Sequence, residues 1–398
     1  MSHQKMLSLN REEALLIDCI KYFQSKKTED SIRDSFSETV DWSYLDALAT
    51  YHGLKPLLYH ILSSDKFREL IPSEVLSSLE KFYKVNSMWN SLLYERLANI
   101  VDTMNSNEIP VMTIKGPVMA KLLYGNIAMR EFLDLDLLVD HEHIHIAKDL
   151  LITNGYVLDF EMPRGFELNY ERHSYYYNMI FHEDKMPVDL HWSLIPQEYS
   201  FSLVTEEIMG NSKLTVVEDK EFLVMKPEYL LIYLCIHGAK HGWVQLNWIL
   251  DISQLILTND IDWDFVIDKT RKLRAVSMVY LGILLATDLF CIKVPDKILS
   301  EVRSEKRINA NLHRAYEILF PTAVVSYAGK LRHKLFYMSL MSRFKDKLYF
   351  IHDLVFKPTR YEWSLIALPH YLYFLYYLLR PIRLGVKYLN RLVSSIGR

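Results

Sequence analysis

The sequence is short of cysteine, glycine and proline, and each shortage argues against a class of protein. Three cysteines, Cys19, Cys235 and Cys291, are scattered over 398 residues without a CxxC pair. This spacing favours three reduced thiols over disulfides or a zinc site. Only 12 Gly and 13 Pro stand beside 26 Tyr and 18 Phe. That composition argues against disorder and predicts a helix-rich protein with aromatic packing.

Neither sign of charge dominates, because 46 Lys and Arg face 49 Asp and Glu, a net charge of -3. The balance gives no general reason to expect nucleic acid or an anionic membrane as a partner, although it leaves room for a local basic patch. Residues 1–10 are polar and lack an apolar run, so we expect no signal peptide and a cytoplasmic location.

The hydrophobic pattern changes twice along the chain, which predicts three units. Residues 1–107 carry helical periodicity, with a capping box at Asn10 and Glu13 and a long apolar stripe ending near Met104. Residues 108–226 mix short strands and helices, and residues 227–398 return to helical periodicity. The fold class we expect is α+β, a small mixed sheet flanked by N- and C-terminal helical domains.

The pattern of the middle unit predicts a strand, a helix, a second strand, a second helix and a hairpin. Residues 109–114 form a short apolar run that ends at Lys115-Gly116-Pro117, where a helix is expected to begin. Residues 132–139 alternate acids with aliphatic residues, as a strand does, and residues 141–153 fit a helix. The runs 175–181 and 188–194 flank a polar turn and predict a hairpin.

The acids of this unit carry the strongest indication of chemistry. Side chains alternate along a strand, so Asp134 and Asp136 share one face while Leu135 and Leu137 point into the core. Asp189 lies in the middle of a second apolar strand. Acids in such positions are uncommon unless they are paired or bind metal. Three of them on neighbouring strands can hold divalent metal for phosphoryl or nucleotidyl transfer, whereas D-x-D alone also fits an exposed strand face.

Two further features could bind phosphate. Lys115 and Gly116 lie at a turn into a helix, where backbone N–H groups and one positive charge favour an anion. Arg130 lies four residues before Asp134 and could contact a phosphate or the carboxylates. A salt bridge that holds its loop explains Arg130 equally well.

The segment K-G-P-x-x-A-x-x-L-Y-x(5)-R-x-x-x-D-x-D-L-L-V, residues 115–139, resembles the polymerase-β-type nucleotidyltransferase superfamily. It is most similar to a poorly characterised bacterial family of uncharacterised nucleotidyltransferases, and the looser likeness extends over most of the chain. The resemblance implies that Asp134, Asp136 and Asp189 hold Mg²⁺ or Mn²⁺ and that the substrate is an NTP, ATP in the first instance. Gly116-Pro117 replaces the superfamily's G-S or G-G turn, which removes one contact to the triphosphate that Lys115 could replace.

Four polar residues outside the acids are further candidates for nucleotide contact. His191 shares the strand face of Asp189, although a histidine packed beside Trp192 is an equal alternative. His237, Lys240 and His241 share one helical face. This face could turn toward nucleotide or acceptor, or it could be an ordinary polar face packed on Asp251. Gly238 stands where the HExxH zinc motif needs Glu, which argues strongly against a zinc protease.

Residues 363–379 form a strongly apolar and aromatic stretch, interrupted by Pro369 and His370 and followed by basic residues. At this length a transmembrane helix is improbable. We expect a buried C-terminal helix with a basic tail, and peripheral membrane contact is the alternative.

The leading hypothesis is a metal-dependent enzyme that moves a nucleotide from an NTP to an acceptor hydroxyl or phosphate. The acceptor could be a small molecule, a peptide, a lipid-linked sugar or a tRNA, and the near-neutral charge mildly disfavours tRNA. Two alternatives remain, a catalytically inactive nucleotidyltransferase-like binding module and a toxin-like enzyme that modifies RNA or protein.

Overall fold

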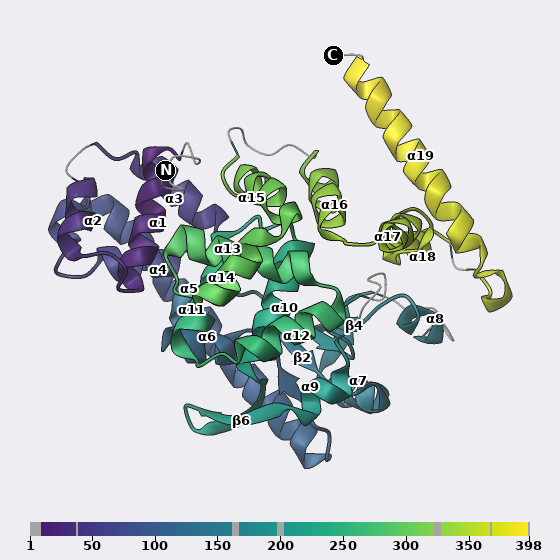
Figure 1. The fold of residues 1–398 in the computed structure, drawn as a ribbon. Helices are drawn as coiled ribbons and strands as arrows, with labels where there is room; N and C mark the ends of the chain where they lie inside the picture. Colours follow the sequence, from purple (N-terminus) through teal and green to yellow (C-terminus); the bar gives the residue numbers. More distant parts are fainter. Residues whose placement is uncertain are drawn as a thin grey trace.

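The computed structural model describes residues 9–36, 39–160, 167–196, 203–321, 328–366 and 368–396. Figure 1 shows helices packed around a central sheet, with the N-terminal helices at one end and the C-terminal helix projecting from the other. The first third of the chain is helical, as predicted: α1 (Arg11–Phe23), α2 (Glu29–Phe36), α3 (Trp42–Tyr51), α4 (Lys55–Leu62) and α5 (Ser73–Ser106). The predicted capping box opens α1.

The described strands form one mixed seven-stranded sheet in the order β3-β4-β5-β2-β1-β7-β6. Their bounds are β1 (Met112–Thr113), β2 (Leu135–Leu138), β3 (Tyr156–Leu158), β4 (Tyr176–Phe181), β5 (Pro187–His191), β6 (Ser212–Val217) and β7 (Lys220–Met225). Strand β2 is parallel to β5 and β1 is parallel to β7, while the other pairs are antiparallel. This arrangement confirms the expected α+β class with a mixed sheet.

Helices connect the strands and then form the rest of the molecule. Between the strands lie α6 (Pro117–Tyr124), α7 (Ile144–Thr153), α8 (Glu167–Glu171) and α9 (Thr205–Gly210), with 3₁₀ turns at η3 (Ile127–Met129) and η4 (His141–His143). The later helices are α10 (Pro227–Lys240), α11 (Leu246–Thr258), α12 (Trp263–Leu273), α13 (Val276–Phe290), α14 (Asp296–Ser304), α15 (Lys306–Leu319), α16 (Ala328–Leu340), α17 (Phe344–Phe356), α18 (Arg360–Leu365) and α19 (Leu375–Ile396).

The two faces of the sheet are covered by different helices. One face buries Leu135, Leu137, Val188 and Leu190 against α5 and α7. The opposite face carries the acids, and Leu138 there belongs to the core that α10, α11 and α13 form with α1, α3 and α4. The acidic face is therefore enclosed by helices that are far apart in the sequence.

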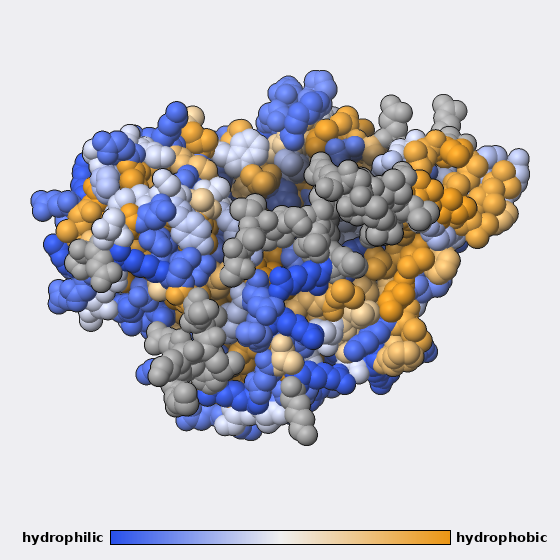
Figure 2. Space-filling model, turned by 90° about the horizontal axis from the view of Figure 1, so that it is seen from above, coloured by the Kyte–Doolittle hydropathy of each residue, from blue (hydrophilic) through white to orange (hydrophobic). Residues whose placement is uncertain are grey.

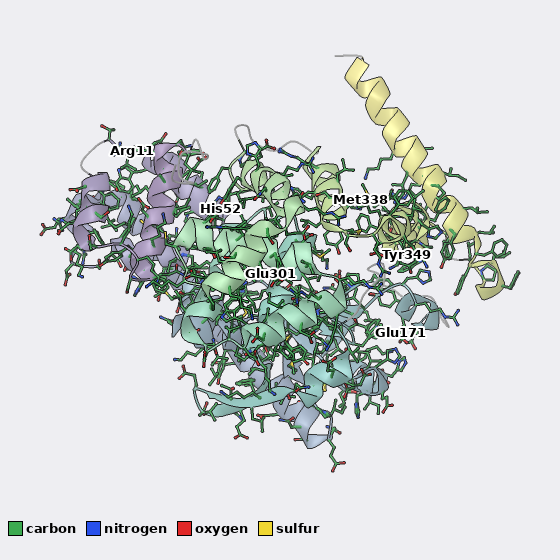
Figure 3. The ribbon with its side chains drawn as sticks, viewed as in Figure 1. Arg11, His52, Glu171, Glu301, Met338 and Tyr349 are labelled. Atoms are coloured by element: carbon green, nitrogen blue, oxygen red, sulfur yellow. The ribbon has the colours of Figure 1, made fainter. Side chains whose placement is uncertain are left out.

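The N-terminal and C-terminal helices meet directly. Figure 3 shows His52 between the two groups, and its Nδ1 atom accepts a hydrogen bond from the backbone N–H of Leu246. Nearby, the Gln24 side chain donates to Ser253 at 2.6 Å and to Gln254 at 3.0 Å. These buried polar contacts fix how the first helices sit on α11.

Several local predictions differ from the structure. The strand expected over residues 132–139 is regular only over Leu135–Leu138, and residues 132–134 before it line a cavity. Helical periodicity over residues 263–292 corresponds to two helices, α12 and α13, and Arg274 between them adopts a left-handed conformation. The hairpin β6–β7 was not predicted, although alternating residues on either side of Glu218 and Asp219 carry its signal.

The expected single buried helix over residues 363–379 is wrong. The stretch is divided among the end of α18, a 3₁₀ turn η5 (His370–Leu372) and the start of α19. Pro369 cannot continue a helix from α18, and Tyr371 and Phe374 beyond it are 68% and 60% exposed. Among the described helices, none is long and apolar enough to cross a membrane.

Gly238 in α10 faces the fully buried ring of Trp243, and a Cβ atom there would lie 2.2 Å from it. We predict that Gly238→Ala lowers the free energy of unfolding by about 1–3 kcal/mol, because the ring or the helix must shift. Gly385→Ala in α19 is the matched control, since its Cβ meets nothing within 4 Å. Urea unfolding measures both variants, and equal stabilities would contradict the packing described for Trp243.

Candidate active site

The sheet register brings the three predicted acids to one place. Asp136 and Asp189 are direct neighbours across the parallel strands β2 and β5, so their side chains lie on the same face. Asp134 lies two residues before Asp136, at the entry to β2, and lines the same cavity. If Asp189 lay on the opposite face of the sheet, the three acids could not hold a metal together. The register instead places Asp189 on the same face as Asp136.

Two side chains hold the Asp136 carboxylate, the imidazole of His191 and the ammonium group of Lys115. His191 Nε2 donates to Asp136 Oδ1 at 3.0 Å, and Lys115 Nζ lies 3.9 Å from Asp136 Oδ2. Burial by itself raises the pKa of Asp136, but Lys115 and His191 outweigh it and hold the pKa well below its usual range. Asp136 is thus an ionised carboxylate with fixed orientation.

Asp134 is in the opposite electrostatic state. Burial raises the pKa of its carboxyl to about 6, and the charges of Asp136 and Asp189 add to the rise. Asp189 itself accepts a hydrogen bond from the Asn178 amide at 2.5 Å. A bound cation would favour the ionised form of Asp134, against the effects of burial and of the neighbouring acids.

The turn at Lys115 and Gly116 reaches the same cavity. Gly116 precedes α6 with φ 78° and ψ -148°, a backbone conformation that glycine adopts at little cost. Lys115 Nζ lies 3.1 Å from the ring nitrogens of His237, and burial lowers the pKa of this lysine. Burial also lowers the pKa of His237 far below its ordinary value, so its neutral ring can accept a hydrogen bond from Lys115.

Arg130 makes the salt bridge that was one of its two predicted roles. Its guanidinium binds Asp251 of α11 through Nε and Nη2, with an Nη2–Oδ2 distance of 2.9 Å. Tyr124 donates to the same carboxylate at 2.7 Å. Arg130 also lines the cavity, so phosphate contact by this residue stays a prediction.

The remaining predicted residues lie around the same cavity of about 540 Å³. His241 follows α10, and burial lowers its pKa to about 3, with the charges of Lys240 and Lys115 adding to the effect. Lys240 donates to the Tyr175 hydroxyl at 2.7 Å. The structure thus brings every predicted site residue to one cavity: Asp134, Asp136, Asp189, Lys115, Gly116, Arg130, His191, His237, Lys240 and His241.

Other residues that shape the cavity were not identified from the sequence. Asn86 and Asn90 of α5 donate to backbone carbonyls of the loop that precedes β2, among them that of Arg130. Their i, i+4 spacing on the apolar stripe of α5 was the available signal. Tyr176 stacks on His191 with ring centroids 5.1 Å apart, and only the strand pairing reveals that contact.

The donor set fits a divalent metal. Asp136, Asp189 and His191 each offer a ligand atom within 4.8 Å of one another, and Asp134 lies beside them. Carboxylate oxygens suit Mg²⁺ and Mn²⁺, and an imidazole nitrogen is an additional ligand that many transition metals accept. The arrangement can therefore neutralise phosphate charge beside a basic turn.

Comparison with known proteins gives the family. A family model described as uncharacterised nucleotidyltransferase matches residues 38–291, so the chain belongs to that family. Its members are nucleotidyltransferases by description, which agrees with the resemblance stated from residues 115–139.

The chain has no match among the curated proteins. One similar solved structure is that of the antibiotic-resistance factor ANT(2″)-Ia, with 13% identity and a TM-score of 0.32. The match covers 50% of this chain and 96% of that one.

The two acids of the D-x-D pair are predicted to affect stability in opposite directions. In metal-free buffer the folded chain holds the Asp134 proton up to about pH 6, whereas the unfolded chain releases it near the ordinary aspartate pKa of 3.8. Stability therefore falls as pH rises between these values. We expect Asp134→Asn to exceed the wild type by roughly 2–3 kcal/mol above pH 6 and to lose that advantage near pH 4.

Asp136→Asn is the matched variant for this measurement. Its lowered pKa contributes stability above the unfolded value that is lost as pH falls, and the substitution leaves Lys115 and His191 without their carboxylate. We expect it to be less stable than the wild type at pH 7. Urea unfolding in EDTA from pH 4 to 8 tests both variants, and a loss of stability at pH 7 in the Asp134 variant would contradict the raised pKa of Asp134.

Proposed function

We propose that this chain is a metal-dependent enzyme that transfers an NMP group from an NTP, ATP in the first instance, to an acceptor hydroxyl. The observation that carries the proposal is the side-by-side position of Asp136 and Asp189 on parallel strands, next to Asp134 and a basic turn. Membership of a nucleotidyltransferase family supports the reaction class.

The roles of the residues follow from their surroundings. Asp134, Asp136 and Asp189 would hold Mg²⁺ or Mn²⁺, and His191 orients Asp136 through its hydrogen bond. When bound, the metal would neutralise the triphosphate and acidify the attacking hydroxyl. Lys115 and the backbone N–H groups that follow Gly116 would bind phosphate oxygens. His237 positions Lys115, and the Arg130–Asp251 pair fixes the loop before β2.

The charge balance of the site argues against an inactive binding module. Burial raises the pKa of Asp134 and the charges of Asp136 and Asp189 add to the rise, and a purely structural role would not need all three acids. Lys115 and Gly116 lie beside the acids and suit a bound phosphate, and His191 suits the orientation of an acid that binds metal.

The first functional prediction concerns nucleotide binding. We expect the wild type to bind a non-hydrolysable ATP analogue in the presence of Mg²⁺, with binding weakened when EDTA is added. Asp134→Ala and Asp136→Ala should each reduce Mg²⁺-dependent affinity by more than about tenfold, or 1.4 kcal/mol, because each removes a metal ligand. Isothermal titration calorimetry measures the affinities.

Asp102→Ala is the control, since this acid pairs with Lys220 on the surface, away from the cavity. Wild-type affinity in either Asp134→Ala or Asp136→Ala would refute the metal assignment. Incubation with each α-labelled NTP and a cell extract then identifies the nucleotide and the acceptor. Growth arrest on expression of the wild type, absent with Asp136→Ala, would favour the toxin-like alternative.

We also propose that the C-terminal helices contact an anionic membrane surface. Exposed apolar side chains recur four residues apart from Phe374, just before α19, through Leu378, Ile382 and Val386 of that helix, and form one stripe. Figure 2 shows hydrophobic surface gathered at this end of the molecule. Residues 344–387 contain seven Lys and Arg but three Asp and Glu, although the whole chain is acidic. Apolar and basic groups together suit an anionic lipid interface.

Vesicle sedimentation tests this surface. We expect the wild type to bind vesicles that contain phosphatidylserine but not vesicles of phosphatidylcholine alone, and salt should weaken the binding. Phe374→Ser with Ile382→Ser should reduce the bound fraction several-fold, because both side chains are exposed and insert without unfolding the helix. Met88→Ser, an equally exposed residue of α5, is the control. Unchanged binding of the double variant would refute the assignment of this stripe.

A further inference from the structure

A second cavity of about 400 Å³ adjoins the candidate active site. Tyr176, Lys240 and His241 line both cavities, so they form the boundary between them. The rest of the second cavity comes mainly from α8 and the helices α16 to α19. In Figure 3, Tyr349 marks α17 and Glu171 marks α8, which lie on either side of this region. The helices α16 to α19 follow the part of the chain that the family model matches.

Among the described residues that line the second cavity, positively charged side chains outnumber acidic ones. Lys240, Lys334, Lys357 and Arg380 face it, and the acid among its lining residues is Asp353. Asp353 Oδ2 lies 3.9 Å from Lys357 Nζ. The buried Glu362, which is not among the lining residues, binds Arg380 at 3.3 Å. Such a lining favours an anionic group with several oxygens.

Aromatic rings form part of the remaining wall. Tyr170 and Trp363 meet edge to face with centroids 5.7 Å apart, and Tyr176 stands at the boundary. Flat rings beside cations suit a ligand with an apolar face and hydroxyl groups, such as a sugar. Tyr176 also stacks on His191, which binds Asp136, so a ligand that reached past Tyr176 would approach the acids.

We propose that the second cavity binds the acceptor of the reaction and that this acceptor is a phosphorylated sugar or polyol. The inference rests on the proposed nucleotidyl transfer and names its acceptor class. The phosphate binds among Lys334, Lys357 and Arg380, and a hydroxyl reaches past Tyr176 toward Asp189.

In the reaction, the acceptor hydroxyl oxygen forms a bond to the α-phosphorus of the NTP. The bond from the α-phosphorus to the oxygen that bridges it to the β-phosphorus breaks, and pyrophosphate leaves with the electron pair. The hydroxyl proton passes to the Asp189 carboxylate and then to solvent. No oxidant or further reactant is needed.

Calorimetry with the full chain tests the cavity. With Mg²⁺ and a non-hydrolysable ATP analogue filling the first site, we titrate inorganic phosphate, glucose 6-phosphate and glucose. Phosphate and glucose 6-phosphate should bind and glucose should not. Lys334→Glu with Lys357→Glu should weaken phosphate binding at least tenfold while leaving the affinity for the analogue unchanged. Lys345→Glu, an exposed lysine of α17 outside the cavity, should behave as the wild type.

The outcomes separate the two proposals. Loss of analogue binding in the wild type would refute the nucleotide site, and the phosphate titration would then be repeated without the analogue. Phosphate binding that is absent, or equal in the wild type and the double variant, would refute the acceptor cavity. Vesicles that carry phosphatidic acid, compared with soluble glucose 6-phosphate, distinguish a lipid-borne phosphate from a free one. Thermal melting confirms that the lysine variants are folded.

Discussion

The parallel pairing of β2 with β5 is the constraint on which the site depends, because its register places Asp136 directly beside Asp189. A shift of one residue would turn one of these acids into the core beneath the sheet. The aliphatic residues between the acids prevent that shift, since Leu135, Leu137, Val188 and Leu190 are all buried on the other face. The hydrophobic core thus enforces an arrangement of like charges that electrostatics alone would oppose.

The residues around the acids affect the pKa values of Asp134 and Asp136 in opposite directions. Lys115 and His191 stabilise the ionised form of Asp136, whereas Asp134 has no comparable effect to offset burial, and its pKa rises. Buried charge pairs further out, such as Arg130 with Asp251, hold the surrounding loops in place. The protein itself therefore compensates part of the negative charge of the three acids, and a bound cation would compensate more of it.

The sequence predicted most of the sheet region, because strand alternation and the K-G-P turn are local signals. It also predicted Asp134, Asp136 and Asp189 as one group, which the strand pairing then brings together. It did not predict the stacking of Tyr176 on His191 or the pairing of Arg130 with Asp251, which depend on strand order and on helix packing over long distances in the chain. The C-terminal stretch was misjudged because apolar composition was taken for burial, whereas Tyr371 and Phe374 are exposed.

The shared core of the first and later helices has a consequence for biosynthesis. Helices α1, α3 and α4 share one buried core with α10, α11 and α13, which are translated some 200 residues later. The amino-terminal helices thus emerge from the ribosome before the surface that completes their core exists. Chain segments with such distant partners fold slowly and expose apolar surface meanwhile. This protein is therefore expected to depend on holding chaperones during synthesis more than its size alone suggests.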